Sequence, residues 1–156
     1  MSIAVSVQQY LFREHVPFNV IVHAPTWDSA HSAESAHISG HRLAKSVVLE
    51  DEDGYVMAVI PASHKLDLQA VREELHRTLN LSNEHTIAKL FKDCEPGAVP
   101  PLPGVYGIDS VVDQILTDVP EVYLEGGDHR SLIRLSGEEF RKVIAGSPQR
   151  HISHPL

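Results

Sequence analysis

The chain has 156 residues, of which 42% are hydrophobic, and its 21 acidic and 13 basic side chains give a net charge of −8 at neutral pH. This length and composition fit one globular domain with its own core, and the single cysteine excludes an internal disulfide. The acidic balance excludes a broad face for duplex nucleic acid, because phosphate binding needs clustered lysine and arginine. No apolar run reaches the length of a membrane span, and the first twelve residues lack the basic start of a secretory signal. We therefore expect a soluble, cytoplasmic protein with no membrane partner.

The N-terminal part of the chain predicts a helix and then a strand. Apolar residues recur every three or four positions over residues 3–14, which predicts an amphipathic helix that Ser2 caps and Pro17 ends. Residues 18–23 are rich in β-branched and aromatic side chains and predict a buried strand. A turn then leads into a short helix, which we expect over residues 26–36.

The middle of the chain predicts a hairpin followed by two helices. The apolar runs at residues 43–49 and 55–60 predict two strands, and the Asp-Gly pair between them supplies the positive backbone angles of a tight turn. Apolar residues at helical spacing predict a helix over residues 67–79. Ser82 is expected to cap a further helix that ends near Phe91.

The last third begins with a loop and ends with two strands and a helix. Residues 93–104 contain four prolines and two glycines, so we expect a shaped loop through which no helix or central strand runs. Residues 119–125 and 131–135 predict strands on either side of a Gly-Gly-Asp-His turn. Ser136 and Glu139 form a capping box, which predicts the start of the last helix.

Together these elements predict an α/β fold of the α+β kind. We expect one compact domain over residues 1–150, with a mixed, mainly antiparallel sheet that curls toward a barrel and is surrounded by helices. We expect residues 151–156 to form a flexible C-terminal tail.

Lys45 is the first candidate for a functional side chain. It lies in the middle of a predicted strand, where period-two alternation places it on one face with Leu43 and Val47. One interpretation is an exposed lysine that protects an edge strand from aggregation. The alternative is a lysine in a pocket, where its ammonium would bind a phosphate or a carboxylate.

Two glycine-containing segments are the next candidates. Gly97 allows a ligand to approach the backbone of the proline-stiffened loop closely, and a fixed run of N–H donors suits a carbonyl oxygen that acquires negative charge. The loop is equally well described as a rigid turn. His129 follows Gly126 and Gly127. It either positions a substrate or shuttles a proton, or it is a solvated residue at a hairpin tip.

Histidine and cysteine chemistry is less favoured by the pattern. His23, His31, His37 and His41 stand eight, six and four residues apart without a zinc-protease motif, which favours separate surface histidines over a shared metal site. Cys94 has no Cys-x-x-Cys partner, so an ordinary packed thiol is favoured over a nucleophile.

Four short motifs, in order, resemble those of the YbaK family, also called the prolyl-tRNA-synthetase-associated domain. They are HAPT at 23–26, GHRLAKSVVLEDEDGYVMAVIP at 40–61, CEPGAVPP at 94–101 and VYLEGGDHRSLIRLSGEEF at 122–140. The resemblance covers residues 2–145 and depends on the order of the motifs, since each is short.

The resemblance implies hydrolysis, in trans, of the ester that joins a wrong amino acid to the terminal ribose of a tRNA. Lys45 matches the family's strand lysine, which holds the backbone of the terminal adenosine, and Gly97 and Pro101 match its G-x-x-x-P loop beside the ester. His129 falls near a position that lines the amino-acid pocket. The implied mechanism uses no metal and no cofactor, because the ribose hydroxyl of the substrate helps to position the water.

The resemblance also implies partners and a substrate class. We expect contacts to substrate from Gly127, Ala98, Ser46 and Arg42, with Lys45, Arg42 and neighbouring His41 forming a small positive mouth on an acidic body. The partners would be the acceptor end of a tRNA and an aminoacyl-tRNA synthetase, and the amino acid would be small, such as Ala, Ser, Cys or Thr. Ser46 and Pro103 depart from common family residues, which leaves the amino-acid preference open. The alternatives are a catalytically silent adaptor of the same fold and a histidine-dependent metal protein.

Overall fold

The structure is a computed structural model that describes residues 3–24, 31–33 and 36–156. The predicted Ser2 cap and most of the helix predicted over residues 26–36 lie outside these residues. In chain order the elements are α1 (Val5–Arg13), β1 (Asn19–Val22), β2 (Leu43–Asp51), β3 (Gly54–Pro61), β4 (His64–Leu66), α3 (Leu68–Leu75), β5 (Asn80–Leu81), α4 (Glu84–Leu90), α5 (Pro103–Tyr106), β6 (Asp109–Asp113), the 3-10 helix η1 (Gln114–Thr117), β7 (Glu121–Glu125), β8 (Ser131–Ser136), α6 (Gly137–Val143), β9 (Gln149–Arg150) and β10 (Ser153–Pro155).

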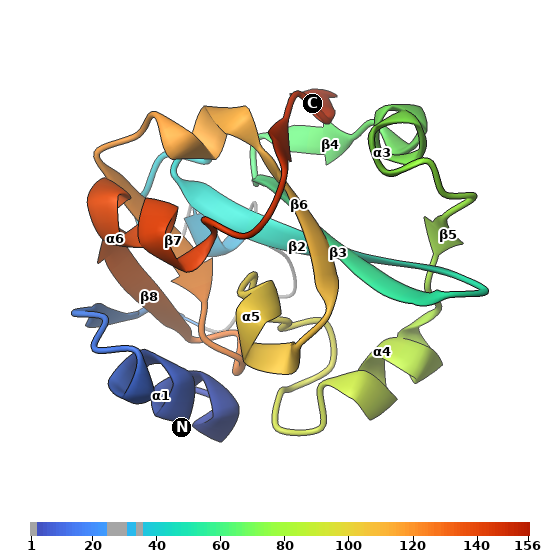
Figure 1. The fold of residues 1–156 in the computed structure, drawn as a ribbon. Helices are drawn as coiled ribbons and strands as arrows, with labels where there is room; N and C mark the ends of the chain where they lie inside the picture. Colours follow the sequence, from blue (N-terminus) through green and yellow to red (C-terminus); the bar gives the residue numbers. More distant parts are fainter. Residues whose placement is uncertain (1–2, 25–30, 34–35) are drawn as a thin grey trace.

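One mixed sheet of eight strands organises the molecule. Its spatial order is β1-β8-β7-β2-β3-β6-β9, and β5 pairs with β2 outside this path. The pairs β1–β8, β7–β8, β2–β3 and β2–β5 are antiparallel, whereas β2–β7, β3–β6 and β6–β9 are parallel. Figure 1 shows the sheet curving around the core, with α1, α5 and α4 along one rim. The predicted mixed, mainly antiparallel sheet with surrounding helices is confirmed.

The hairpin of β2 and β3 contributes buried side chains to the two larger apolar clusters of the molecule. Asp51 pairs with Gly54 at the turn, where Gly54 has a φ of 131°, a conformation that glycine adopts without strain. Along β3, Met57 and Val59 enter the larger apolar cluster, while Val56, Ala58 and Ile60 enter a second cluster with α3. Burial on both faces explains why the strand is a continuous apolar run.

Helix ends follow the predicted chemistry with small shifts. The hydroxyl of Ser136 accepts a hydrogen bond from the amide of Glu139 at 3.1 Å, as the capping box predicts. Asn83 rather than Ser82 caps α4, accepting from the amide of Thr86 at 2.8 Å. Helix α3 ends at Leu75, before the predicted residue 79, because His76 adopts the left-handed conformation.

Two predictions about connecting segments are wrong. Residues 151–156 are not a flexible tail, because Ser153–Pro155 form β10, which pairs with β4, and buried Asp113 accepts hydrogen bonds from the Ile152 amide and the Ser153 hydroxyl. The loop at 93–104 also ends in a helix, since α5 starts at Pro103, the first helical position where proline fits. Within the described residues, no helix has the length and apolar character needed to cross a membrane.

Candidate active site

A cleft of about 410 Å³ lies between β2, α4 and the proline-rich loop. The sequence predicts these three segments separately, and the fold brings them together around one hollow. Apolar side chains form much of its wall, and hydroxyl, thiol, carboxylate and backbone groups supply the polar part. The lining residues are Ser46, Val47, Val48, Leu81, Ser82, Glu84, Ile87, Ala88, Cys94, Glu95, Pro96, Gly97 and Val99.

Three hydrogen bonds hold the loop at the wall of the cleft. The amide of Glu95 donates to the carbonyl of Gly127 at 2.8 Å, and the amide of Ala98 closes a turn on the carbonyl of Glu95 at 3.0 Å. The hydroxyl of Ser46 on β2 donates to the carbonyl of Val99 at 3.1 Å. Ala98 and Pro101 are buried, so the loop is anchored to β2 and to the turn between β7 and β8 and is shaped before any ligand binds.

Gly97 lies at the cleft wall with a φ of 80°, in the left-handed region that favours glycine. The neighbouring carbonyl of Pro96 accepts a hydrogen bond from Nε2 of His129 at 2.6 Å, and this ring atom carries the hydrogen because a carbonyl only accepts. Within the described part of the chain, the amides of Gly97 and Val99 donate to no acceptor. The loop therefore offers backbone donors beside the cleft.

The Gly-Gly-Asp-His turn, residues 126–129, contacts this loop and holds it in place. A Cβ on Gly126 would lie 2.8 Å from the carbonyl oxygen of Ser131, so only glycine fits there. Gly127 has a φ of 119° and His129 a φ of 60°, and the buried carboxylate of Asp128 holds the turn by accepting from the amides of Arg130 and Ser131. His129 and Gly127 thus contact the loop but do not line the cleft.

Lys45 is half-buried on β2, directly before the cleft residue Ser46. Its backbone pairs with Ile60 of β3. Because side chains alternate along a strand, Lys45 shares a face with Leu43 and Val47, whereas Ser46 faces the loop. In the strand order β2 lies between β7 and β3, and β7 pairs with it at Leu43 and Ala44, directly before Lys45.

Arg42 does not join the cleft. Its guanidinium lies 3.4 Å from Oε1 of Glu121 and lines a separate hollow of about 380 Å³ together with His41 and Tyr123. The predicted positive mouth of Lys45, Arg42 and His41 is therefore not assembled at the cleft, since Arg42 and His41 line the separate hollow. Over residues 3–24, 31–33 and 36–156, no three histidine, cysteine or acidic side chains gather closely enough to share a metal ion.

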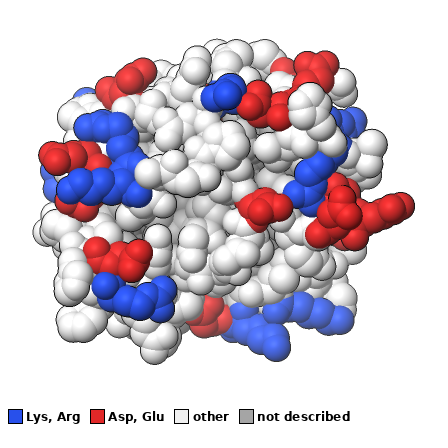
Figure 2. All heavy atoms as spheres, in the orientation of Figure 1, with Lys and Arg blue, Asp and Glu red and all other residues white. Residues whose placement is uncertain are grey.

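The charged side chains that line the cleft are acidic. Among the described residues that line the cleft, Glu84 and Glu95 are the charged ones, and both are exposed. On the face drawn in Figure 2, acidic and basic side chains are interleaved around a broad uncharged centre and do not form a basic patch. The cleft therefore attracts a cationic group and repels phosphate.

Cys94 also lines the cleft, and burial raises the pKa of its thiol to about 12. Its Sγ lies 3.4 Å from the hydroxyl oxygen of Tyr106. We expect iodoacetamide to alkylate Cys94 of the folded protein on the order of 10³-fold more slowly near pH 8 than in the urea-unfolded chain, because only the thiolate reacts. Mass spectrometry of timed samples measures both rates. Equal rates would show that the thiol ionises as readily as in the unfolded chain, which would contradict the raised pKa and restore Cys94 as a candidate nucleophile.

Sequence reasoning missed the contribution of α4 and of Ser82. Helix α4 supplies Glu84, Ile87 and Ala88 to the cleft, and Ser82 adds a buried hydroxyl that has no hydrogen-bond partner among the described residues. The sequence predicts this helix but does not indicate that it packs beside β2 and the proline-rich loop. Asn83 caps α4, so Ser82 is not needed for that purpose. A serine directly before a residue that can cap the helix was the available sequence signal.

A preformed loop with backbone donors beside a small cleft is typical of enzymes that act on activated carbonyl groups. The sequence profile of the aminoacyl-tRNA editing domain matches residues 23–143. The chain belongs to this family, which includes the YbaK proteins. No curated protein matches the chain.

Solved structures with this fold share about a quarter of its residues. APE2540, called a hypothetical protein, has a TM-score of 0.82 at 24% identity, over 96% of this chain and 99% of that one. A protein named provisionally as a trans-editing enzyme for prolyl-tRNA synthetase has a TM-score of 0.80 at 22% identity, over 96% and 95%. A protein of Marinobacter aquaeolei VT8, provisionally assigned to signal transduction, has a TM-score of 0.76 at 24% identity, over 96% of this chain but 30% of its own.

Proposed function

We propose that the chain hydrolyses, in trans, the ester of a tRNA that carries a wrong small amino acid such as Ala, Ser, Cys or Thr. The observation that carries this proposal is the anchored loop, whose Gly97 amide lies at the cleft wall without an acceptor in the described residues. The water oxygen attacks the carbonyl carbon, and negative charge develops on the carbonyl oxygen, where a fixed N–H donor stabilises it. The bond to the ribose then breaks, the ribose oxygen takes a proton, and the free amino acid leaves.

Five of the predicted residues have distinct parts in this proposal. Gly97 contacts the reacting ester, Ser46 and His129 position its loop through the carbonyls of Val99 and Pro96, and Pro101 stiffens the loop. Lys45 holds the backbone of the terminal adenosine, as the family resemblance implies. An aminoacyl ester is already activated, so a positioned water and these groups suffice without a metal or a covalent intermediate.

Charge supports the orientation of the substrate. Glu84 and Glu95 attract the α-ammonium group of an aminoacyl ester, and they repel the phosphates of the acceptor strand. The aminoacyl end therefore enters the cleft, and the strand passes outside it. Only a short single-stranded end needs to bind, which is compatible with a net charge of −8.

Deacylation of a panel of mischarged tRNAs tests the proposal. The purified chain should release at least one of Ala, Ser, Cys or Thr from a non-cognate tRNA and leave correctly charged tRNAs intact. Release is measured with radiolabelled amino acids, and spontaneous hydrolysis in buffer is the control. Binding of the same tRNAs without any release would instead establish the adaptor.

Removal of metal ions should leave this activity unchanged. The proposed mechanism moves protons only between water, the ester and the ribose, so we expect equal turnover before and after exhaustive dialysis against a chelator. The same sample with added zinc is the control. A loss of turnover that zinc restores would contradict the mechanism and favour a histidine-bound metal.

A further inference from the structure

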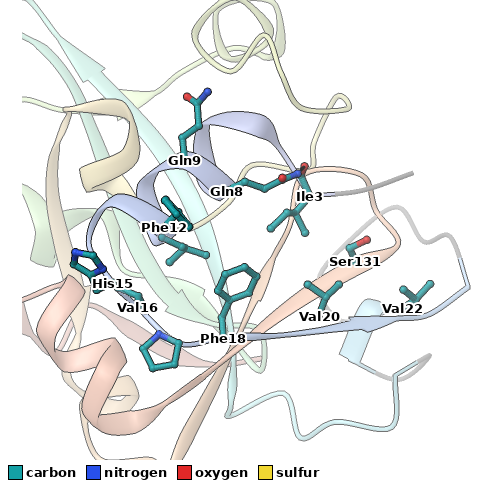
Figure 3. A pocket seen from close by; sticks show the side chains of 12 residues that line it. Ile3, Gln8, Gln9, Phe12, His15, Val16, Phe18, Val20, Val22 and Ser131 are labelled. Carbon is teal, nitrogen blue, oxygen red and sulfur yellow. Dashed lines mark hydrogen bonds between the residues drawn. The ribbon is translucent and has the colours of Figure 1, made fainter.

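A second hollow, of about 870 Å³, lies between α1 and β1 and takes no part in the proposed reaction. Figure 3 shows Phe12 of α1 on one side, Val20 and Val22 of β1 on the other, and Phe18 between them. We call this hollow the α1–β1 groove. Phe12 is 84% exposed and Val22 is 72% exposed. In a monomer, contact of these apolar side chains with water is unfavourable in free energy.

The described lining of the α1–β1 groove contains no lysine, arginine, aspartate or glutamate, and His15 is the one titratable side chain among these residues. The whole chain, by contrast, has a net charge of −8. Nucleic acid needs basic side chains and is therefore not the occupant. A second copy of the acidic chain is repelled by like charges elsewhere on the surface, but the described lining of the groove presents no carboxylate to repel it.

Strand β1 is the end strand of the sheet and pairs on one side with β8. The amide of His23 donates to the carbonyl of Arg130 at 2.8 Å, so alternation turns the backbone groups of Val20 and Val22 away from β8. Within the described residues these groups have no hydrogen-bond partner. The strand Asn19–Val22 has no charge, proline or glycine of its own, so it lacks the usual protection of an edge.

We propose that a second copy of this chain docks here, pairing β1 with β1 antiparallel across a two-fold axis. The edge is self-complementary, because a strand related to itself by such an axis is antiparallel and exposes the same outward donors and acceptors. The axis also places both α1 helices on the same face of the joined sheet. The two uncharged grooves then form one apolar layer, with Phe12 of each copy covering the seam over Val20 and Val22.

Sedimentation velocity over a wide concentration range tests this proposal. We expect the wild-type chain to reach twice its monomer mass of 17.3 kDa as concentration rises. Phe12→Glu places a charge in the seam and should leave only monomer. Val5→Glu is the matched control, since Val5 is also exposed on α1 but does not line the groove, and it should dimerise like the wild type.

Val22→Pro tests the strand pairing separately from the apolar contact. Proline removes the outward N–H of Val22 without loss of a bond to β8, so it should abolish the dimer while circular dichroism and the melting temperature confirm the fold. Val22→Ala keeps the N–H and should only weaken the dimer. A wild type that stays monomeric throughout, or equal dissociation by Val5→Glu and Phe12→Glu, would overturn the proposal.

Discussion

Replacement of Gly97 by alanine is expected to lower deacylation about 10²-fold or more. The φ of 80° is strained for alanine, and relief of that strain rotates the amide that we propose as the donor to the ester. Loss of one such backbone donor costs roughly 3 kcal/mol in the transition state. The added Cβ would lie 3.6 Å from Cε1 of His129, an ordinary contact, so the effect comes from the backbone and not from a clash.

The same strain also lowers stability, and a matched glycine separates the two effects. Gly107 ends α5 with a φ of 65° and has open space around its Cβ position, outside the cleft. Gly97→Ala and Gly107→Ala should each cost about 1 kcal/mol of unfolding free energy, but only the first should lose turnover per folded molecule. Melting curves and rates on the same samples decide this. Normal turnover by folded Gly97→Ala would remove the loop from the active site.

Replacement of Lys45 by alanine is expected to lower deacylation by roughly 100-fold, in line with the loss of a charged hydrogen bond of about 3 kcal/mol. Lys45→Arg should also impair the reaction, since a forked guanidinium does not replace a compact ammonium at a half-buried position. Rates on mischarged tRNA and the binding constant of uncharged tRNA measure the effect. We expect weaker binding together with slower turnover.

Lys65→Ala is the control for the lysine experiment. Lys65 is exposed on β4 and lies outside the cleft, so its removal changes the net charge equally without a change at the site. It should keep the rate of the wild type. A fully active Lys45→Ala protein would show that this lysine serves the sheet and not the substrate.

The sequence predicted the parts of the fold that local chemistry determines. The hairpin of β2 and β3, the strands β7 and β8 and the Ser136 cap follow from alternation, turn residues and side-chain hydrogen bonding. Strand β6 was missed, although it lies inside the sheet beside β3, because Asp109 and Asp113 at its ends conceal the apolar pair Val111 and Val112. A parallel partner far away in the chain leaves no local pattern.

The same distinction applies to the site. Gly97 and the Gly-Gly-Asp-His turn were recognisable because positive backbone angles need particular residues. Their contact was not, since the bond from His129 to the carbonyl of Pro96 joins positions 33 residues apart. The structure shows that the ring of His129 holds the loop through the carbonyl of Pro96, and its predicted contact with substrate stays a prediction. The roles of Lys45 and Gly97 in catalysis stay predictions until the variants are measured.

Two hydrogen bonds of the buried Asp113 side chain can form only late in the synthesis of the chain. Oδ2 of Asp113 accepts from the amide of Ile152 and the hydroxyl of Ser153, which the ribosome adds 39 and 40 residues later. Until that segment leaves the exit tunnel, the carboxyl group of Asp113 lacks these two donors, and its burial is costly. The last part of the chain to be made is therefore needed for the sheet to close around this carboxylate with both hydrogen bonds in place.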